Sequence, residues 1–223
     1  ALKDLRVIDL SGASRGRHGY VCGISEIYRK QLVRGATRAF IPSPEATVAL
    51  IMLHPLAANL LLPQADITLT VDACNNYTPA SDAPLTVREV LAELQHSFTG
   101  DVRFTIWADS KIPDTPGSTT QRGLRIATTI PSAMLPADIA LLYDNIYDDH
   151  NFSYTVLNSL HTREAEGTHK CLISLTSPAP DTLRVEAVAD LRMRGGAGDA
   201  VHVMNLLFGL HERVGLSLKA SSF

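Results

Sequence analysis

The chain has 223 residues, of which 45% are hydrophobic and 19% are charged, as in an ordinary globular protein. Its 20 lysines and arginines stand against 23 acidic residues, and the formal charge of −3 argues against a nucleic-acid partner. The longest apolar run, residues 46–62, is interrupted by His54, Pro55 and Asn59, which makes it a poor membrane span. The composition therefore predicts a soluble protein that binds neither membranes nor nucleic acid.

Three cysteines, Cys22, Cys74 and Cys171, form no CxxC pair and cannot all pair with one another, as is typical of a reducing compartment. No pattern of a secretory signal opens the sequence. Both observations predict a cytoplasmic protein. Because the sequence starts at Ala1 and enters an apolar segment almost at once, we expect a fragment or a processed product.

In the first half of the chain, residues 5–10 read as a buried strand, followed by a glycine- and arginine-containing loop and a short helix over 25–33. Ser43 and Pro44 suit the start of a buried helix that runs to about residue 62, with Ser43 as its N-cap. The remaining elements of this half are a strand over 66–73, a loop over 75–84, and a helix over 86–96 whose capping box is Thr86 and Glu89.

The second half alternates strands with two helices. We expect strands over 102–107, 122–130, 152–156, 171–175 and 183–191, helices over 137–148 and 198–210, and a loop over 111–121. This order predicts an α+β fold: a mixed, mostly antiparallel sheet backed by helices.

A glycine-rich turn, residues 194–198, precedes the last helix. Glycines let backbone amides approach a ligand closely, and a helix N-terminus attracts anions such as phosphate. Glycine before a helix also serves packing, so the turn alone leaves both interpretations open.

Several segments in the right order resemble the N-acetyl-γ-glutamyl-phosphate reductase family. Residues 194–210, RGGAGDAVHVMNLLFGL, are similar to its C-terminal signature, in which a basic residue and small residues precede Gln-Ala-Val, Met-Asn-Leu and Phe-Gly. Shorter matches are VIDLS with Arg15, GISEIYR at 23–29, Arg122-Gly123, and GTHKC at 167–171.

The resemblance implies an N-terminal Rossmann domain for NADP and a mixed-sheet domain for catalysis and homodimerisation. It divides the chain into a Rossmann remnant over 1–40, a substrate and dimerisation domain over 41–193, and a turn and helix over 194–223 that pack back on the nucleotide side. The family's glycine-rich βαβ unit is not among the 223 residues. Carried over by motif, the cofactor-binding residues are Ser11, Gly195, Gly198 and Asn205, and the substrate-binding residues are Arg122, Gly167, Thr168 and His169.

The departures from the family pattern concern its catalytic groups. Pro44 stands where the family has its nucleophilic cysteine, leaving Ser43 and Cys74 as the candidate replacements. No histidine occurs between residues 101 and 149, where the family places its catalytic one. His169 replaces an asparagine, and we expect a loop histidine bonded to backbone. Asp199 replaces a glutamine, and its charge should repel a phosphate.

Two hypotheses follow. The chain is either an oxidoreductase of the N-acetyl-γ-glutamyl-phosphate reductase type with altered chemistry, or a non-catalytic binding or assembly subunit that keeps the fold. The missing cysteine predicts no thiol-based reduction, and Asp199 in place of the glutamine predicts weak or absent NADP binding. The histidines show no metal-binding spacing, so we expect no metal. A helix face with Val201, Met204, Leu207 and Phe208 should be exposed and favour a homodimer.

Overall fold

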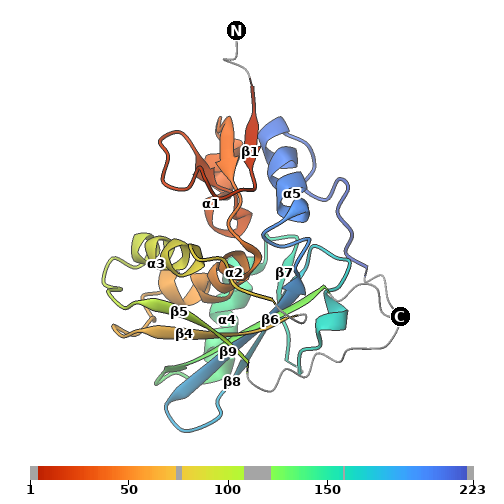
Figure 1. The fold of residues 1–223 in the computed structure, drawn as a ribbon. Coiled ribbons are helices and arrows are strands. Elements are labelled where there is room, and N and C mark those ends of the chain that lie inside the picture. Colours follow the sequence, from red (N-terminus) through yellow and green to blue (C-terminus); the bar gives the residue numbers. More distant parts are fainter. Residues whose placement is uncertain (1–4, 74–76, 108–121, 158, 220–223) are drawn as a thin grey trace.

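A computed structural model describes residues 5–73, 77–107, 122–157 and 159–219 in two layers (Figure 1). The upper, N-terminal layer is a small parallel sheet of order β1-β3-β2, made of β1 (Val7–Asp9), β2 (Val21–Cys22) and β3 (Arg38–Phe40). Helices α1 (Ser25–Val33) and α5 (Ala197–Phe208) pack beside it. The predicted 25–33 helix is confirmed. The strand near the N-terminus is shorter than expected and only half-buried, and β2 and β3 are too short for their sequence pattern to show.

The lower layer is a six-stranded sheet of order β5-β4-β6-β9-β8-β7. Its strands are β4 (Ile67–Ala73), β5 (Val102–Ile106), β6 (Gly123–Pro131), β7 (Ser153–Thr155), β8 (Cys171–Thr176) and β9 (Thr182–Asp190). The outer pairs β4–β5 and β7–β8 are parallel, and the three pairs between them are antiparallel. The predicted fold class, a mixed and mostly antiparallel sheet backed by helices, is confirmed.

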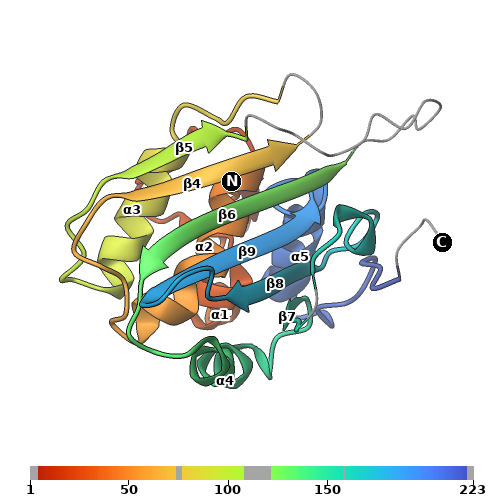
Figure 2. The ribbon, with the colours of Figure 1, turned by 90° about the horizontal axis from the view of Figure 1, so that it is seen from below.

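Helices gather on one face of this sheet. Seen from below, α2 (Pro44–Ala58) and α3 (Ala83–Leu94) lie behind the strands, and α4 (Pro136–Tyr147) lies along the side of β8 and β7 (Figure 2). A short 3-10 turn, Thr162–Glu164, lies near β6 and β9. None of the helices within the described residues is long and apolar enough to cross a membrane.

Helix α2 forms the centre of the main core. Pro55 lies inside the helix and has no N–H to donate to the carbonyl of Ile51, four residues earlier. Two tyrosines of α4 compensate: Tyr147 donates its hydroxyl to the carbonyl oxygen of Ile51, and Tyr143 donates to that of Met52 over 2.7 Å. The buried backbone therefore stays hydrogen-bonded across the proline, and α4 is fixed to α2.

Two predicted helix boundaries are wrong. The central helix ends at Ala58, not near residue 62. Ser43 is its N-cap residue, as predicted, but the hydroxyl donates to Glu45 over 2.8 Å and makes no capping hydrogen bond. Helix α3 starts at Ala83, inside the predicted 75–84 loop. The expected capping box is therefore absent: Thr86 is already helical and donates to the carbonyl of Asp82. The predicted 111–121 loop lies outside the described residues.

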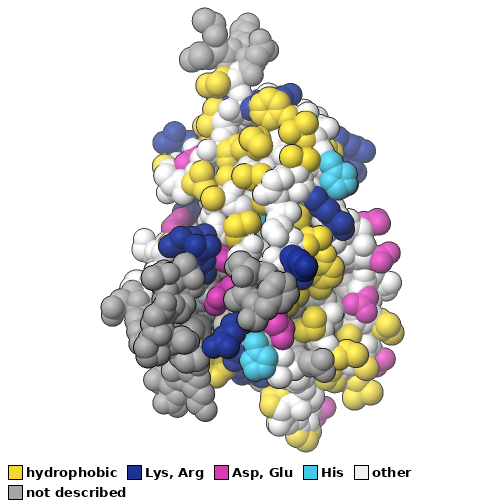
Figure 3. Space-filling view, turned by 90° about the vertical axis from the view of Figure 1, so that its right-hand side faces the viewer, with side chains coloured by type: hydrophobic (Ala, Val, Ile, Leu, Met, Phe, Trp, Pro, Cys, Tyr) yellow, Lys and Arg dark blue, Asp and Glu magenta, His cyan; other side chains and the backbone are white. Residues whose placement is uncertain are grey.

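The main apolar core surrounds α2 and extends into the upper layer through Cys22, Ile24, Tyr28 and Phe40. A much smaller core lies within the upper layer, between α1, α5 and the upper sheet, and consists of Leu32, Ala39, Ile41, Val203, Leu206 and Leu207. Leu207 is 6% exposed, so the prediction that it faces solvent is wrong. Met204 and Phe208 are 38% and 55% exposed. Figure 3 views the molecule from the right-hand side of Figure 1 and shows hydrophobic side chains gathered on its upper part.

Candidate functional site

The N-terminus of α2 borders a cavity of about 210 Å³ between the two layers. Its lining unites four residues that the sequence singles out in separate motifs: Ser11, Ser43, Pro44 and Gly195. Both serine hydroxyls are committed to carboxylates, since Ser11 donates to Asp9 over 2.6 Å and Ser43 to Glu45 over 2.8 Å. The tertiary structure thus brings residues from separate motifs to one cavity, and their role in binding stays a prediction.

Glu45 connects two segments that line this cavity. Its fully buried carboxylate accepts hydrogen bonds from the backbone N–H of Ala80 over 2.6 Å and from the hydroxyl of Tyr77. Together with the bond from Ser43, these contacts tie the 77–80 loop to the start of α2. Tyr77 and Ala80 lie 32 and 35 positions from Glu45, and no sequence pattern predicted these contacts.

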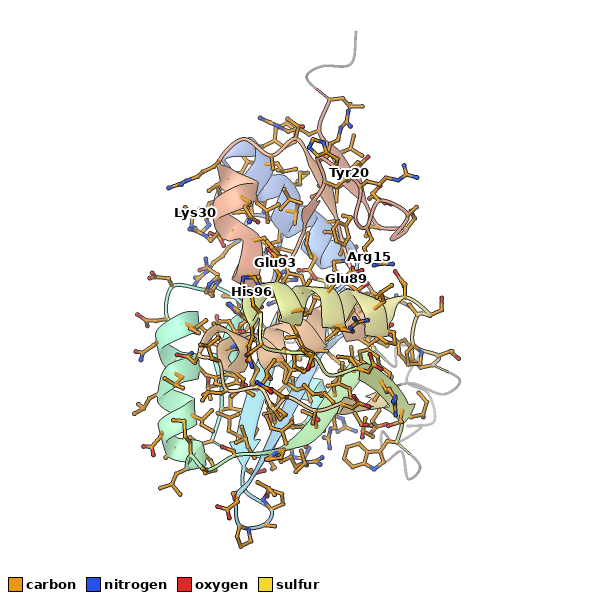
Figure 4. The ribbon with its side chains drawn as sticks, turned by 90° about the vertical axis from the view of Figure 1, so that its left-hand side faces the viewer. Arg15, Tyr20, Lys30, Glu89, Glu93 and His96 are labelled. Carbon is orange, nitrogen blue, oxygen red and sulfur yellow. The ribbon has the colours of Figure 1, made fainter. Side chains whose placement is uncertain are left out.

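A second cavity, of about 350 Å³, shares Arg15, Phe40 and Thr86 with the first. Figure 4 shows Arg15 and Tyr20 of the upper layer near Glu89 and Glu93 of α3. Arg15 donates to Glu89 over 2.7 Å and lies 3.8 Å from Asp82. The Arg15 guanidinium therefore already pairs with carboxylates of the chain itself.

The glycine-rich turn packs against α2. A Cβ atom on Gly195, whose φ is +67°, would lie 2.3 Å from the Pro44 backbone, and one on Gly198 would lie 2.6 Å from the carbonyl oxygen of Met193. The N–H of Gly195 donates to Asp199 over 2.6 Å. These glycines permit close packing, and one amide expected to face a ligand is satisfied by an internal carboxylate.

Asn205, a predicted cofactor-binding residue, has hydrogen-bond partners within the protein. Its buried side-chain amide donates to the carbonyl oxygens of Glu212 and Val214 over 3.0 and 2.9 Å. The residue therefore fixes the segment that follows α5. Because Gly195 and Gly198 also serve packing, all three residues have a structural role, and their role in binding NADP stays a prediction.

The predicted substrate-binding residues lie in two places. Gly167 and Arg122 contact the end of β9, and Thr168 is buried in the segment before β8. The N–H of Gly167 donates to Asp190 over 2.7 Å, and the carbonyl of Arg122 accepts from Leu191, the next residue after β9. Thr168 is buried and donates to the carbonyl oxygen of Ala165. Arg122 is not part of the lining of either cavity between the layers.

A buried ionic cluster, which sequence reasoning missed, links the layers next to the turn. Its centre is Arg194, fully buried, whose guanidinium donates to Glu26 of α1 over 2.7 Å and to Asp199 of α5 over 3.3 Å. Ser153 of β7 also donates to Glu26, over 2.7 Å. Burial opposes the ionised form of Glu26, but the charge of Arg194, with smaller contributions that include the hydrogen bond from Ser153, holds the pKa of this carboxyl below its usual range.

Two histidines extend this cluster. His169 Nε2 lies 3.2 Å from Asp199 Oδ1 and 3.3 Å from His202 Nδ1, and His202 Nε2 lies 3.0 Å from Glu212 Oε2. Burial and the charge of Arg194 lower the pKa of His169 to about 4, so the imidazole is neutral at pH 7. The expectation that its side chain bonds to backbone is wrong. Asp199 is also not a free charge that repels phosphate, because it is paired inside the protein.

The sequence is similar to curated proteins of one name. The protein named N-acetyl-gamma-glutamyl-phosphate reductase of Parabacteroides distasonis is 29% identical over 248 aligned positions, which cover 99% of this chain and 73% of the relative. That of Bacteroides thetaiotaomicron is 28% identical with the same coverage. The chain is a divergent relative of the N-acetyl-γ-glutamyl-phosphate reductases. No family model matches it.

Solved structures support the same fold. A probable aspartate-semialdehyde dehydrogenase from Pseudomonas aeruginosa gives a TM-score of 0.64 at 15% identity, covering 92% of this chain and 73% of that one. Aspartate semialdehyde dehydrogenase II from Vibrio cholerae gives 0.63 at 12% identity, with coverages of 91% and 72%. The chain therefore has the semialdehyde dehydrogenase-like fold.

The start of α2 carries no cysteine. Pro44, which the motif resemblance aligned with the family's nucleophilic cysteine, has no reactive side chain. Burial raises the pKa values of Cys22 and Cys171 to about 12, so both are thiols rather than thiolates at pH 7. Cys74, the other candidate, lies outside the described residues. Neither of the two described cysteines is an activated nucleophile.

Proposed function

We propose that this reductase relative does not catalyse the thiol-dependent reduction of an acyl phosphate, and that it works as a ligand-binding or assembly protein. The observation that carries the proposal is Pro44 at the N-terminus of α2. There a thiol would benefit from the positive end of the helix, and proline can form no covalent intermediate. The inert, buried Cys22 and Cys171 support it.

We further propose that the ligand is a neutral or cationic small molecule bound in the two neighbouring cavities, which share Arg15, Phe40 and Thr86. Asp82, Glu89 and Glu93 face a single arginine, Arg15, which leaves the lining acidic. Such a lining disfavours an acyl phosphate, whereas the ring of Tyr20 and the carboxylates suit an ammonium group. NADP binding should accordingly be no tighter than about 1 mM, roughly −4 kcal/mol.

An activity assay tests the loss of reduction. The purified chain should consume no NADPH with N-acetylglutamyl phosphate above a protein-free blank. Sustained turnover that disappears in Ser43→Ala or in Cys74→Ser would overturn the proposal and identify the replacement nucleophile. Micromolar NADPH binding by calorimetry would overturn the predicted weakness of the cofactor site.

A gain-of-thiol variant tests the geometry. Pro44→Cys should introduce a thiol that reacts with iodoacetamide at pH 7 much faster than Cys22 or Cys171, because it lies at a helix N-terminus beside a cavity. Mass spectrometry of the labelled peptides measures this. Equal, slow labelling of all three positions would show that the helix N-terminus no longer activates a thiol.

We also propose that two copies pair through the six-stranded sheet, whose near face in Figure 2 is covered by no α-helix of the described residues, although the short turn Thr162–Glu164 lies at one end of it. Leu172 and Val188 are buried on the sheet in a small apolar cluster and would lie at the edge of such an interface. Analytical ultracentrifugation should give a dimer at micromolar concentration. A monomer under those conditions would contradict the pairing.

A further inference from the structure

The buried cluster contains a group of possible metal ligands that neither the family pattern nor the sequence spacing assigns. His169, Asp199 and His202 come from the segment before β8 and from α5, and all three are buried. Within the described residues, their ligand atoms all lie within 4.8 Å of one another. The sequence spacing, from which no metal was expected, did not indicate this arrangement.

We propose that His169 Nε2, His202 Nδ1 and Asp199 Oδ1 bind one divalent cation of the zinc class. The cation would stabilise the junction between the two layers. This proposal is independent of the ligand-binding role suggested above, because it concerns other residues and a different readout.

The spacing of the ligand atoms fits a tetrahedral site. His169 Nε2 lies 3.3 Å from His202 Nδ1 and 3.2 Å from Asp199 Oδ1. Two atoms that each bind zinc at about 2.0–2.1 Å in tetrahedral geometry lie about 3.3–3.4 Å apart. Ser25 Oγ, 3.3 Å from His202 Nδ1, is a candidate fourth ligand from α1.

Outer contacts hold two of the ligands as a metal requires. His202 Nε2 lies 3.0 Å from the carboxylate of Glu212, which keeps the proton on that nitrogen and leaves Nδ1 free to bind. The second carboxylate oxygen of Asp199 accepts the N–H of Gly195 over 2.6 Å, which directs Oδ1 inward. Metal-ligating histidines and carboxylates commonly have such partners.

The charge of the cluster also favours a cation. Glu26, Asp199 and Glu212 contribute three negative charges, whereas Arg194 and Arg29, which donates to Glu212 over 2.7 Å, contribute two positive ones. These carboxylates and guanidinium groups together leave one net negative charge beside the two histidines. Arg194 lies 3.3 Å from Asp199 Oδ1 and will weaken the site, but it does not remove this excess.

His169 and Asp199 are also two of the positions at which the chain departs from the family motifs, with histidine for asparagine and aspartate for glutamine. They lie 30 positions apart in the sequence and in contact in the structure. Two amide side chains bind metals poorly, whereas an imidazole and a carboxylate are good ligands. The same departures therefore create the pair on which the site depends.

The experiment uses protein expressed with added zinc and dialysed against metal-free buffer. Elemental analysis should find one zinc per wild-type chain, and X-ray absorption should show nitrogen and oxygen ligands at about 2.0–2.1 Å. His169→Asn and Asp199→Gln, which introduce the family residues, should lose the zinc while keeping the circular-dichroism spectrum. Added zinc should raise the melting temperature of the wild type but not of these variants.

His96→Asn serves as the matched control, because His96 is exposed and lies outside the cluster, and it should keep its zinc. Glu212→Gln should weaken zinc binding by about 10- to 100-fold through loss of the contact to His202. If Asp199→Gln does not fold, His169→Asn decides alone. Folded wild type without zinc, or zinc retained by His169→Asn at the wild-type level, would overturn the proposal.

Discussion

The two layers of this protein differ in the interactions that stabilise them. The lower layer surrounds α2 with a continuous apolar core, to which the upper layer contributes four residues. The upper layer has only a small core of its own, of six buried apolar residues, and also meets the rest of the chain at the ionic cluster. Apolar burial is tolerant of geometry, but a buried charge is stable only when its partners stay in place. The upper layer should therefore depend on single residues more than the lower one.

The largest effect should come from removing the central charge. Arg194→Met leaves Glu26 and Asp199 without their guanidinium partner, and we expect a loss of about 3–5 kcal/mol of unfolding free energy. Hydrogen exchange should accelerate most in α1 and α5. Denaturant titration and exchange mass spectrometry measure the two effects.

Arg103→Met is the control for this variant. Arg103 makes an exposed ion pair with Asp66 over 2.9 Å, and its loss should cost less than about 1 kcal/mol. Equal losses in the two variants would remove the distinction between the buried junction and the surface.

The two apolar cores should differ in a matched pair of truncations. Leu50→Ala, fully buried in α2, should cost about 2–5 kcal/mol, and Leu207→Ala, in the small upper core, should lie near the lower end of that range. Chemical unfolding measures both. Leu141→Ala, at an exposed position of α4, is the reference, and a cost for Leu207→Ala above that for Leu50→Ala would reverse the comparison.

A smaller effect should follow from the hydrogen bond that compensates for Pro55. Tyr147→Phe removes the donor to the carbonyl of Ile51 and leaves a buried acceptor unpaired, at a cost of about 1–3 kcal/mol. Thermal unfolding tests this. Tyr154→Phe, whose hydroxyl bonds a half-buried backbone carbonyl, should cost less, and the opposite order would show that the carbonyl finds another partner.

The smallest effect concerns Asp9 at the end of β1. Hydrogen bonds from the Ser11 hydroxyl and amide and from Ser14 lower its pKa from 3.8 to about 2. Because the folded pKa is below the unfolded one, this contribution is present above pH 3.8 and is lost as the pH falls toward 2. The stability difference between wild type and Asp9→Asn should shrink over that interval. A difference independent of pH would contradict the assignment.

The sequence by itself determined most elements of the lower layer. Alternating residues predicted β6 and β9, and the Ser-Pro-Glu start with a run of apolar residues predicted the buried α2. These signals are local, because strand and helix periodicity appear within one segment. Thr86 shows the limit of local reasoning: its capping-box spacing is genuine, but Pro84 at the first turn starts the helix earlier.

The motif resemblance singled out Ser11, Ser43, Pro44 and Gly195 in separate segments, and the structure brings them to one cavity. What those residues do was decided by the tertiary structure. Arg15 became a partner of Glu89, 74 positions away, and Glu26 a partner of Arg194, 168 positions away. Such pairs leave no periodic trace in the sequence, because each charge acquires its partner only when both layers fold together and exclude water from the space between them.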